Sequence, residues 1–66
     1  MFEMVRDDKS EYGWIFSPDR VEYRAFAKYD HNDQGYAAGV HDNLGDAIAA
    51  VYYMSILLRA PMQGNA

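Results

Sequence analysis

The segment from residue 47 to residue 60, AIAAVYYMSILLRA, is the most apolar stretch of the 66-residue chain. Only Ser55 and Arg59 are plainly polar in it, so a helix here is apolar around most of its circumference. A membrane-spanning helix needs about 20 mostly apolar residues, and this run is shorter and is followed by Pro61. The segment therefore predicts a helix buried in a folded domain, and it raises the question of what covers its second side.

Length and charge limit the class of protein. A chain of 66 residues makes one small domain, and we expect residues 1–66 to form it, with 1–10 and 61–66 as the segments that can be loose. Without cysteine there are no disulfides and no thiolate sites, and the first ten residues lack a signal-peptide pattern, so we expect a cytoplasmic protein. Ten acids and six bases give a net charge of −4, which opposes binding to nucleic acid or to an anionic membrane.

Three segments have the composition of strands. The stretch EYGWIFS is rich in aromatic residues and ends at SPDR, where Pro18 and Asp19 suit a turn. From Val21 to Tyr29 apolar and polar residues alternate, which predicts one face in the core and one in water. After a polar loop, YAAGVH returns as a third strand. The first ten residues either add a short edge strand or stay loose.

Asn43 and Asp46 mark the start of the helix, because an asparagine cap followed three residues later by a carboxylate has the form of a capping box. Pro61 marks its end, since the residue before proline avoids the α conformation. The predicted fold class is therefore α+β, a three-stranded antiparallel meander followed by one C-terminal helix, residues 44–60, packed on one face.

On a helical wheel of roughly 100° per residue, this helix has two apolar sides. We expect the sheet to cover one stripe, which consists of Ala47, Ala50, Val51, Met54, Leu57 and Leu58. The opposite side, which also holds Ser55, is left for a second copy, a partner protein or the folded-back N-terminal segment. As the interface of a homodimer, this side presents Ile48, Ala49, Tyr52, Ile56 and Arg59.

Candidate contacts to a partner come from one aromatic residue and from carboxylates. Phe26 lies on the polar side of the second predicted strand, so it is either covered by the N-terminal segment or an anchor for a partner. The net charge and the lack of a basic run argue against an aromatic platform for nucleic-acid bases. The carboxylates that we expect to meet a basic partner are Asp7, Asp8, Glu11, Asp30 and Asp33.

No motif for catalysis, for a metal or for a cofactor is present. His31 and His41 each stand beside aspartate, but the strand between them holds them about 20 Å apart. The serines lack a glycine-rich elbow, and the glycines match no phosphate-binding loop. We therefore expect no enzyme activity, no metal site and no cofactor.

The layout of a short acidic hairpin, GWIFSPDRVEYRAFAKYD, followed by one apolar helix, AIAAVYYMSILLRA, resembles the small accessory inhibitors of phages and mobile elements, of which the anti-CRISPR proteins are the nearest kind. The resemblance covers the size and the layout of the chain. It implies a small acidic protein-binding module that occupies a basic surface of a larger nucleic-acid-handling complex, in the host cytoplasm if a phage encodes it. The alternative is a small homo-oligomeric structural or assembly subunit without activity of its own.

Overall fold

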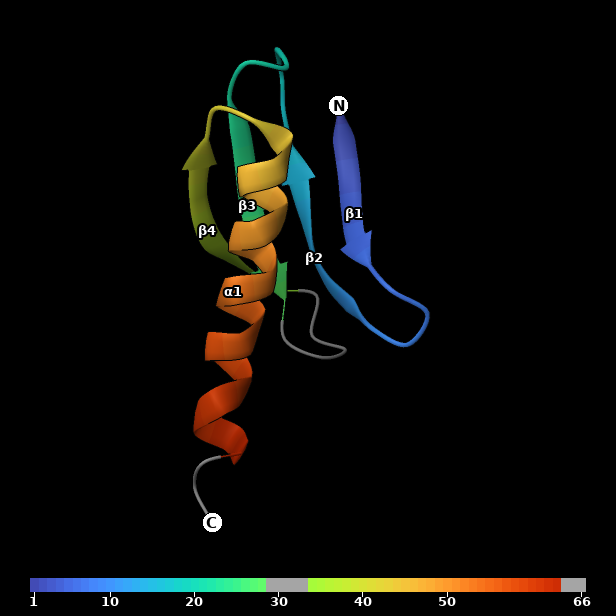
Figure 1. Ribbon diagram of the computed structural model, residues 1–66, viewed down its shortest axis with the longest axis vertical. Helices are drawn as coiled ribbons and strands as arrows, with labels where there is room; N and C mark the ends of the chain where they lie inside the picture. The colour runs from blue at the N-terminus through green and yellow to red at the C-terminus, as the bar shows by residue number, and fades with distance from the viewer. Residues whose placement is uncertain (29–33, 64–66) are drawn as a thin grey trace.

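The described residues of the chain form one antiparallel sheet with one helix on one of its faces (Figure 1). The computed structural model describes residues 1–28 and 34–63, with side chains described through residue 59. Along the chain the elements are β1 (Phe2–Arg6), β2 (Glu11–Phe16), β3 (Tyr23–Lys28), β4 (Gly35–His41) and α1 (Leu44–Gln63).

The sheet has the strand order β1-β2-β3-β4, and every neighbouring pair is antiparallel. The predicted meander and C-terminal helix are confirmed, but the prediction of three strands is wrong because the first residues form β1. Just before this edge strand, the ammonium group of Met1 donates a hydrogen bond to the carbonyl of Ser17, and the carbonyl of Met1 accepts one from the amide of Ser17. β1 lies beside β2 in the plane of the sheet, so it does not fold over the helix or over Phe26.

The core between the sheet and α1 is built from small side chains. The buried apolar residues of this core cluster are Val5, Ile15, Ala25, Ala38, Ala47 and Val51, with Ala27 also buried. Gly13 explains how close the helix lies, because a Cβ atom at this position would stand 2.8 Å from the Cγ1 atom of Val51 and 2.8 Å from the Cα atom of Ala27. The helix therefore packs closely on the sheet where the facing surfaces of α1 and of the sheet are both nearly flat.

Two β-bulges shape the sheet. Val5 pairs with Gly13 and Arg6 with Glu11, so Tyr12 is an extra residue in β2 and turns toward the helix. The second irregularity lies between β3 and β4, where Gly39 has a φ of 92° that glycine adopts without strain. The first bulge is the reason that an aromatic ring from β2 reaches α1.

The helix begins as the sequence predicts. Asn43 accepts a hydrogen bond from the Asp46 amide at its Oδ1 (2.8 Å) and donates one from its Nδ2 to the Asp46 carboxylate (2.9 Å). The predicted end at residue 60 is wrong, because α1 continues through Pro61 to Gln63. Proline lacks the amide hydrogen that would bond four residues back, and its ring crowds the carbonyl of that residue, but these effects can bend a helix without ending it.

The side of α1 that faces the sheet differs from the expected stripe. The buried positions are Ala47, Val51 and Ser55, spaced four residues apart, whereas Leu57 is exposed. The expectation that Ser55 points outward is therefore wrong. Its small side chain fits the flat sheet, and its hydroxyl donates a hydrogen bond to the carbonyl of Tyr52 (2.8 Å), which makes burial acceptable.

Replacing Gly13 by alanine tests the close approach of helix and sheet. We expect the change to lower the free energy of unfolding by about 2 kcal/mol or more, because the added methyl group meets backbone and Val51 atoms that cannot move away. Urea unfolding followed by circular dichroism measures this. Gly45→Ala is the matched control, since Gly45 lies in the exposed first turn of α1 and should gain roughly 0.5–1 kcal/mol from helix propensity. Wild-type stability of Gly13→Ala would contradict the packing described here.

Candidate interaction surfaces

The face of the sheet opposite α1 carries most of the large apolar side chains of the strands. Residues paired across neighbouring strands project from the same face, and the register gives two such rows on this side. We call the large apolar members of these rows the open sheet face, which consists of Phe2, Met4, Trp14, Phe16, Phe26 and Val40. Phe2, Phe16 and Val40 are 41% to 63% exposed.

Trp14 and Phe26 form the centre of the open sheet face. Their rings are stacked, with centroids 5.6 Å apart and planes 21° apart. The indole extends over β4, because a Cβ atom on Gly35 would lie within 2.6 Å of two of its carbons. Phe26 thus lies on the side of β3 away from the helix, as predicted, and Trp14 rather than the N-terminal segment lies against it.

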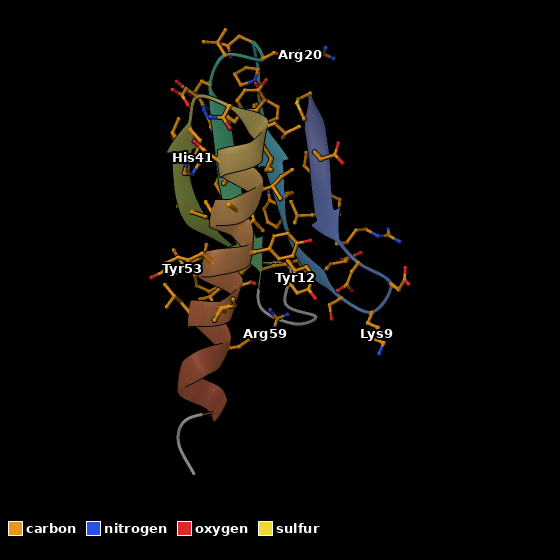
Figure 2. All side chains as sticks on the ribbon, in the orientation of Figure 1. Lys9, Tyr12, Arg20, His41, Tyr53 and Arg59 are labelled. Carbon is orange, nitrogen blue, oxygen red and sulfur yellow. The ribbon has the colours of Figure 1, made fainter. Side chains whose placement is uncertain are left out.

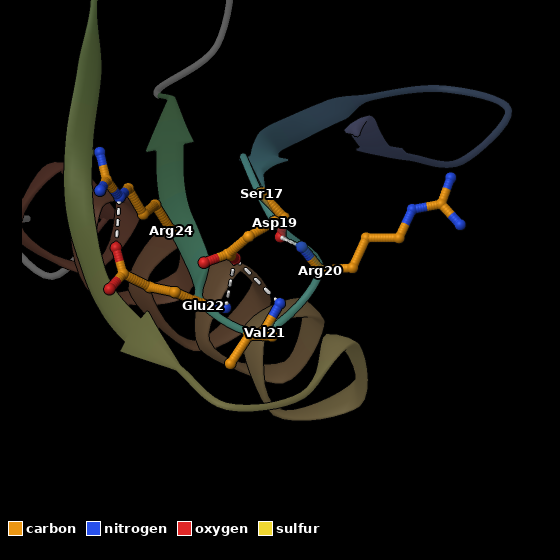
Figure 3. Close-up of polar contacts among 6 residues, drawn as sticks. All are labelled: Ser17, Asp19, Arg20, Val21, Glu22 and Arg24. Carbon is orange, nitrogen blue, oxygen red and sulfur yellow. Dashed lines mark hydrogen bonds and ion pairs between the residues drawn. The ribbon is translucent and has the colours of Figure 1, made fainter.

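Two ion pairs among the described residues lie on this side of the sheet. The Arg24 guanidinium lies 2.6 Å from the Glu22 carboxylate (Figure 3), and the Lys28 ammonium lies 2.9 Å from Glu11. Lys28 is buried, contrary to the expectation of a wet face. Arg24 and Lys28 thus each have an acid next to them at the two ends of the aromatic rows, and Arg6, which lies opposite Glu11 in the register, adds a base at the edge.

The turn between β2 and β3 holds the first of these pairs in place (Figure 3). One oxygen of Asp19 accepts hydrogen bonds from the amides of Val21 (2.9 Å) and Glu22 (3.0 Å), and the Ser17 hydroxyl accepts one from the amide of Arg20 (2.7 Å). The amide of Glu22 and then that of Val21 lower the pKa of Asp19, since both bonds favour its ionised form. Asp19 therefore stabilises the turn between β2 and β3, which is where the sequence places it.

A second apolar surface lies on the side of α1 away from the sheet. We call it the outer helix stripe, and it consists of Ala49, Tyr53, Ile56 and Leu57. Tyr53 and Ile56 are 65% and 63% exposed, and Leu57 is 44% exposed. In Figure 2, Tyr53 points away from the body of the sheet.

The residues expected at a homodimer interface divide between two environments. Ala49 and Ile56 belong to the outer helix stripe, whereas Ile48 packs against the core cluster. Tyr52 and Arg59 lie toward Tyr12, with the Tyr12 and Tyr52 ring centroids 5.0 Å apart and the Arg59 guanidinium carbon 5.3 Å from the Tyr12 centroid (Figure 2). The bulge in β2 thus places Tyr12 over part of the expected interface.

Tyr12 is also tied to the turn between β1 and β2. Its hydroxyl donates a hydrogen bond to one carboxylate oxygen of Asp7 (2.6 Å), and the other oxygen accepts bonds from the amides of Lys9 and Ser10 (2.8 Å each). The Tyr12 hydroxyl, followed by these two amides, lowers the pKa of Asp7. The same bond raises the pKa of Tyr12, because an ionised phenol could not donate to the carboxylate.

A shallow hollow of about 330 Å³ lies beside this turn. It contains four of the six bases of the chain together with three carboxylates and a serine, and its lining consists of Arg6, Asp7, Asp8, Lys9, Ser10, Glu11, Lys28 and Arg59. Because positive and negative side chains are mixed in this lining, the hollow favours binding of neither an anion nor a cation.

The predicted partner-binding acids have different places. Asp7 is engaged in its turn and Glu11 is paired with Lys28, while Asp8 is exposed. Asp30 and Asp33 lie outside the described residues, as does His31. Asp7 and Glu11 thus have local roles, and within the described part of the chain no broad surface of unengaged carboxylates resembles a nucleic-acid backbone.

The described part of the chain contains one histidine, His41. The Nε2 atom of His41 lies 2.9 Å from the Ala38 carbonyl oxygen, which gives this histidine a contact within the β4 bulge. Among the described residues, no three histidine, aspartate or glutamate side chains gather as a metal site. The described helix is not long and apolar enough to cross a membrane.

Comparison of the chain with protein-family models, with curated proteins and with solved structures finds no match.

The pKa of Asp7 leads to a prediction on acid stability. Because its pKa is lowered in the folded state, its stabilising effect is present above the unfolded value of 3.8 and is lost as the pH falls through the folded value. We expect Asp7→Asn to be less stable than the wild type at neutral pH and to lose that difference as the solution becomes more acidic than 3.8. Urea midpoints measured across this range test it.

Asp8→Asn is the control, since it removes a neighbouring carboxylate that makes none of these three hydrogen bonds. An equal difference between Asp7→Asn and wild type at every pH would contradict the assigned role of the carboxylate.

Proposed function

We propose that this chain is a small acidic protein-binding module, without chemistry of its own, that acts by occupying a surface of a larger partner. The observation that carries the proposal is the outer helix stripe, where Tyr53, Ile56 and Leu57 are exposed on a helix anchored to a sheet. Residues at this spacing form the apolar side that a helix presents to a groove in helix-in-groove recognition. Tyrosine and large aliphatic groups are also suitable anchors for such a contact.

The charge near the stripe favours a basic partner. Asp46 is exposed and precedes Ala49 and Tyr53 by three and seven residues, so it lies on the same side of the helix. Asp42 is exposed just before the helix. Arg59, the only base in the described part of α1, lies at Tyr12 instead. A partner that has a groove bordered by lysine or arginine would complement this arrangement.

The finer form of the proposal is an inhibitor of the anti-CRISPR kind that covers a basic surface of a nucleic-acid-handling complex. The net charge of −4 and the stripe bordered by acids support it. This chain and the nucleic acid would compete for the same lysine and arginine side chains of the partner, so binding of the chain would displace the nucleic acid. Such competition does not require an array of carboxylates that imitates phosphates. The assembly-subunit alternative is favoured by a different observation, the open sheet face.

The stripe is tested by capture of partners on the immobilised chain from a lysate of its own host. We expect the wild type to retain a basic protein that salt removes, and Ile56→Glu to weaken retention at least about tenfold, because a carboxylate would be buried in an apolar groove. Val21→Glu is the matched control, since it makes the same charge change at an exposed valine between β2 and β3.

Equal retention by the wild type and Ile56→Glu would refute the role of the stripe. Capture of the chain alone would support the assembly subunit instead.

A further inference from the structure

The distribution of side-chain size between the two faces of the sheet is the reverse of what a lone domain requires. The covered face uses glycine and alanine in its centre, at Gly13, Ala25 and Ala27. The face without a helix carries Trp14, Phe26 and Phe16, with ring or chain surface in contact with water. Phe2, Phe16 and Val40 are 41% to 63% exposed, so apolar surface on this face is still available for burial.

The sequence of β2 shows the same feature. An antiparallel sheet with one wet face normally alternates apolar and polar residues, whereas strands covered on both faces are apolar throughout. From Tyr12 to Phe16 the strand reads YGWIF, in which the residues facing α1 and those facing away are both apolar. Such a strand is typical of a sheet that is packed on both sides.

We propose that the open sheet face is the interface of a homodimer, in which two copies pack sheet against sheet with both helices outside. Sheets stacked in this way lie about 10 Å apart. Trp14 and Phe26 lie on the two central strands, so an isologous pairing brings the same aromatic stack of each copy to the middle of the contact. Large aromatic groups at the centre of an interface commonly supply most of its binding energy.

Charge selects a second copy as the occupant. Two chains of net charge −4 repel each other wherever acids are in excess, and the outer helix stripe next to Asp46 is such a place. On the open sheet face, Arg24 is paired with Glu22 and Lys28 with Glu11, and Arg6 lies opposite Glu11 at the edge, so two copies can meet there without an excess of acids. The carboxylates beside Arg24 and Lys28 also weaken the attraction of these two bases for a nucleic acid.

The available area is sufficient for a moderately stable dimer. Four strands about 4.8 Å apart and six residues long make a footprint of roughly 19 by 20 Å. With large side chains standing on it, two such faces bury on the order of 1,000 Å² in total, which is near the lower limit for a specific interface. The dimer is therefore in equilibrium with its monomer over an accessible concentration range. The outer helix stripe stays exposed in it, so the proposal is independent of the proposed function.

Sedimentation over a dilution series from about 1 µM to about 1 mM tests the dimer, since a micromolar dissociation constant falls within it. We expect the wild type to change from monomer to dimer, and Phe16→Glu combined with Val40→Glu to weaken association at least about a hundredfold, because unpaired carboxylates would be buried. Both sites are exposed in the monomer and adjoin Arg24, so the helical circular dichroism should be unchanged. Tyr53→Glu combined with Ile56→Glu is the control and should still dimerise.

A wild type that is monomeric at every concentration overturns the proposal, as does a dimer that the helix control disrupts and the sheet variant leaves intact. If the double sheet variant loses its helical signal, Phe2→Glu replaces it, since Phe2 is 61% exposed on the edge strand. If Phe2→Glu dimerises as strongly as the wild type, and its Trp14 fluorescence is equally protected from a soluble quencher, the proposal is also overturned. Retention of a foreign protein or of an RNA oligomer on the open sheet face of a monomeric chain would assign the surface to another occupant.

Discussion

The structure depends on how closely α1 lies against the sheet. A side chain at Gly13 would occupy the space of Val51, and the alanines around Gly13 keep the sheet flat where the helix crosses it. Ala47, Val51 and Ser55 supply the matching side of the helix. This contact sets the rotation of α1 about its axis, and so it decides which residues are left on the outer helix stripe.

The same constraint explains the division of the molecule into two apolar surfaces. Because Gly13, Ala25 and Ala27 lie beneath α1, most of the large apolar side chains of the strands lie on the opposite face, around Trp14 and Phe26. The two exposed surfaces differ in charge. On the open sheet face Arg24 and Lys28 are each paired with a carboxylate, whereas the outer helix stripe adjoins Asp46 with no base beside it in the described residues. A surface with charges of both signs suits self-association and an acidic one suits a basic partner, so the proposed dimer and the proposed partner contact are compatible.

The sequence predicts the meander, the helix and its cap because these depend on local signals such as alternation, a turn at Pro18 and the Asn43 cap. The sequence leaves open whether the first ten residues form a strand. The five-residue strand β1 is stabilised by pairing with β2 rather than by the pattern of its own residues, so the pattern does not reveal it. The side of α1 that is buried could not be predicted from a helix that is apolar almost all round. That side is set by the small residues of the sheet, and the i, i+4, i+8 spacing of Ala47, Val51 and Ser55 is a signal that can be found afterwards.

The sequence does not predict the open sheet face, for a related reason. Arg24 and Lys28 led to the interpretation of one side of β3 as wet, but each is paired with a carboxylate that is near in space, and Lys28 is buried. The uninterrupted apolar sequence of β2 was the better indicator. The position of Tyr12 depends on a bulge, and no pattern of residue types reveals a register shift before the strands are paired.

The central claim, that the face away from α1 is covered in the working molecule, can be tested with the intrinsic fluorescence of Trp14, the single tryptophan of the chain. Its indole lies in the centre of that face, so the wavelength of its emission depends directly on whether the face is covered or exposed to water. Emission is measured over a dilution series, with helical circular dichroism recorded on the same samples. The account predicts a shift to longer wavelength on dilution while the helical signal stays constant. An emission maximum that does not change with concentration, at constant helicity, would contradict it.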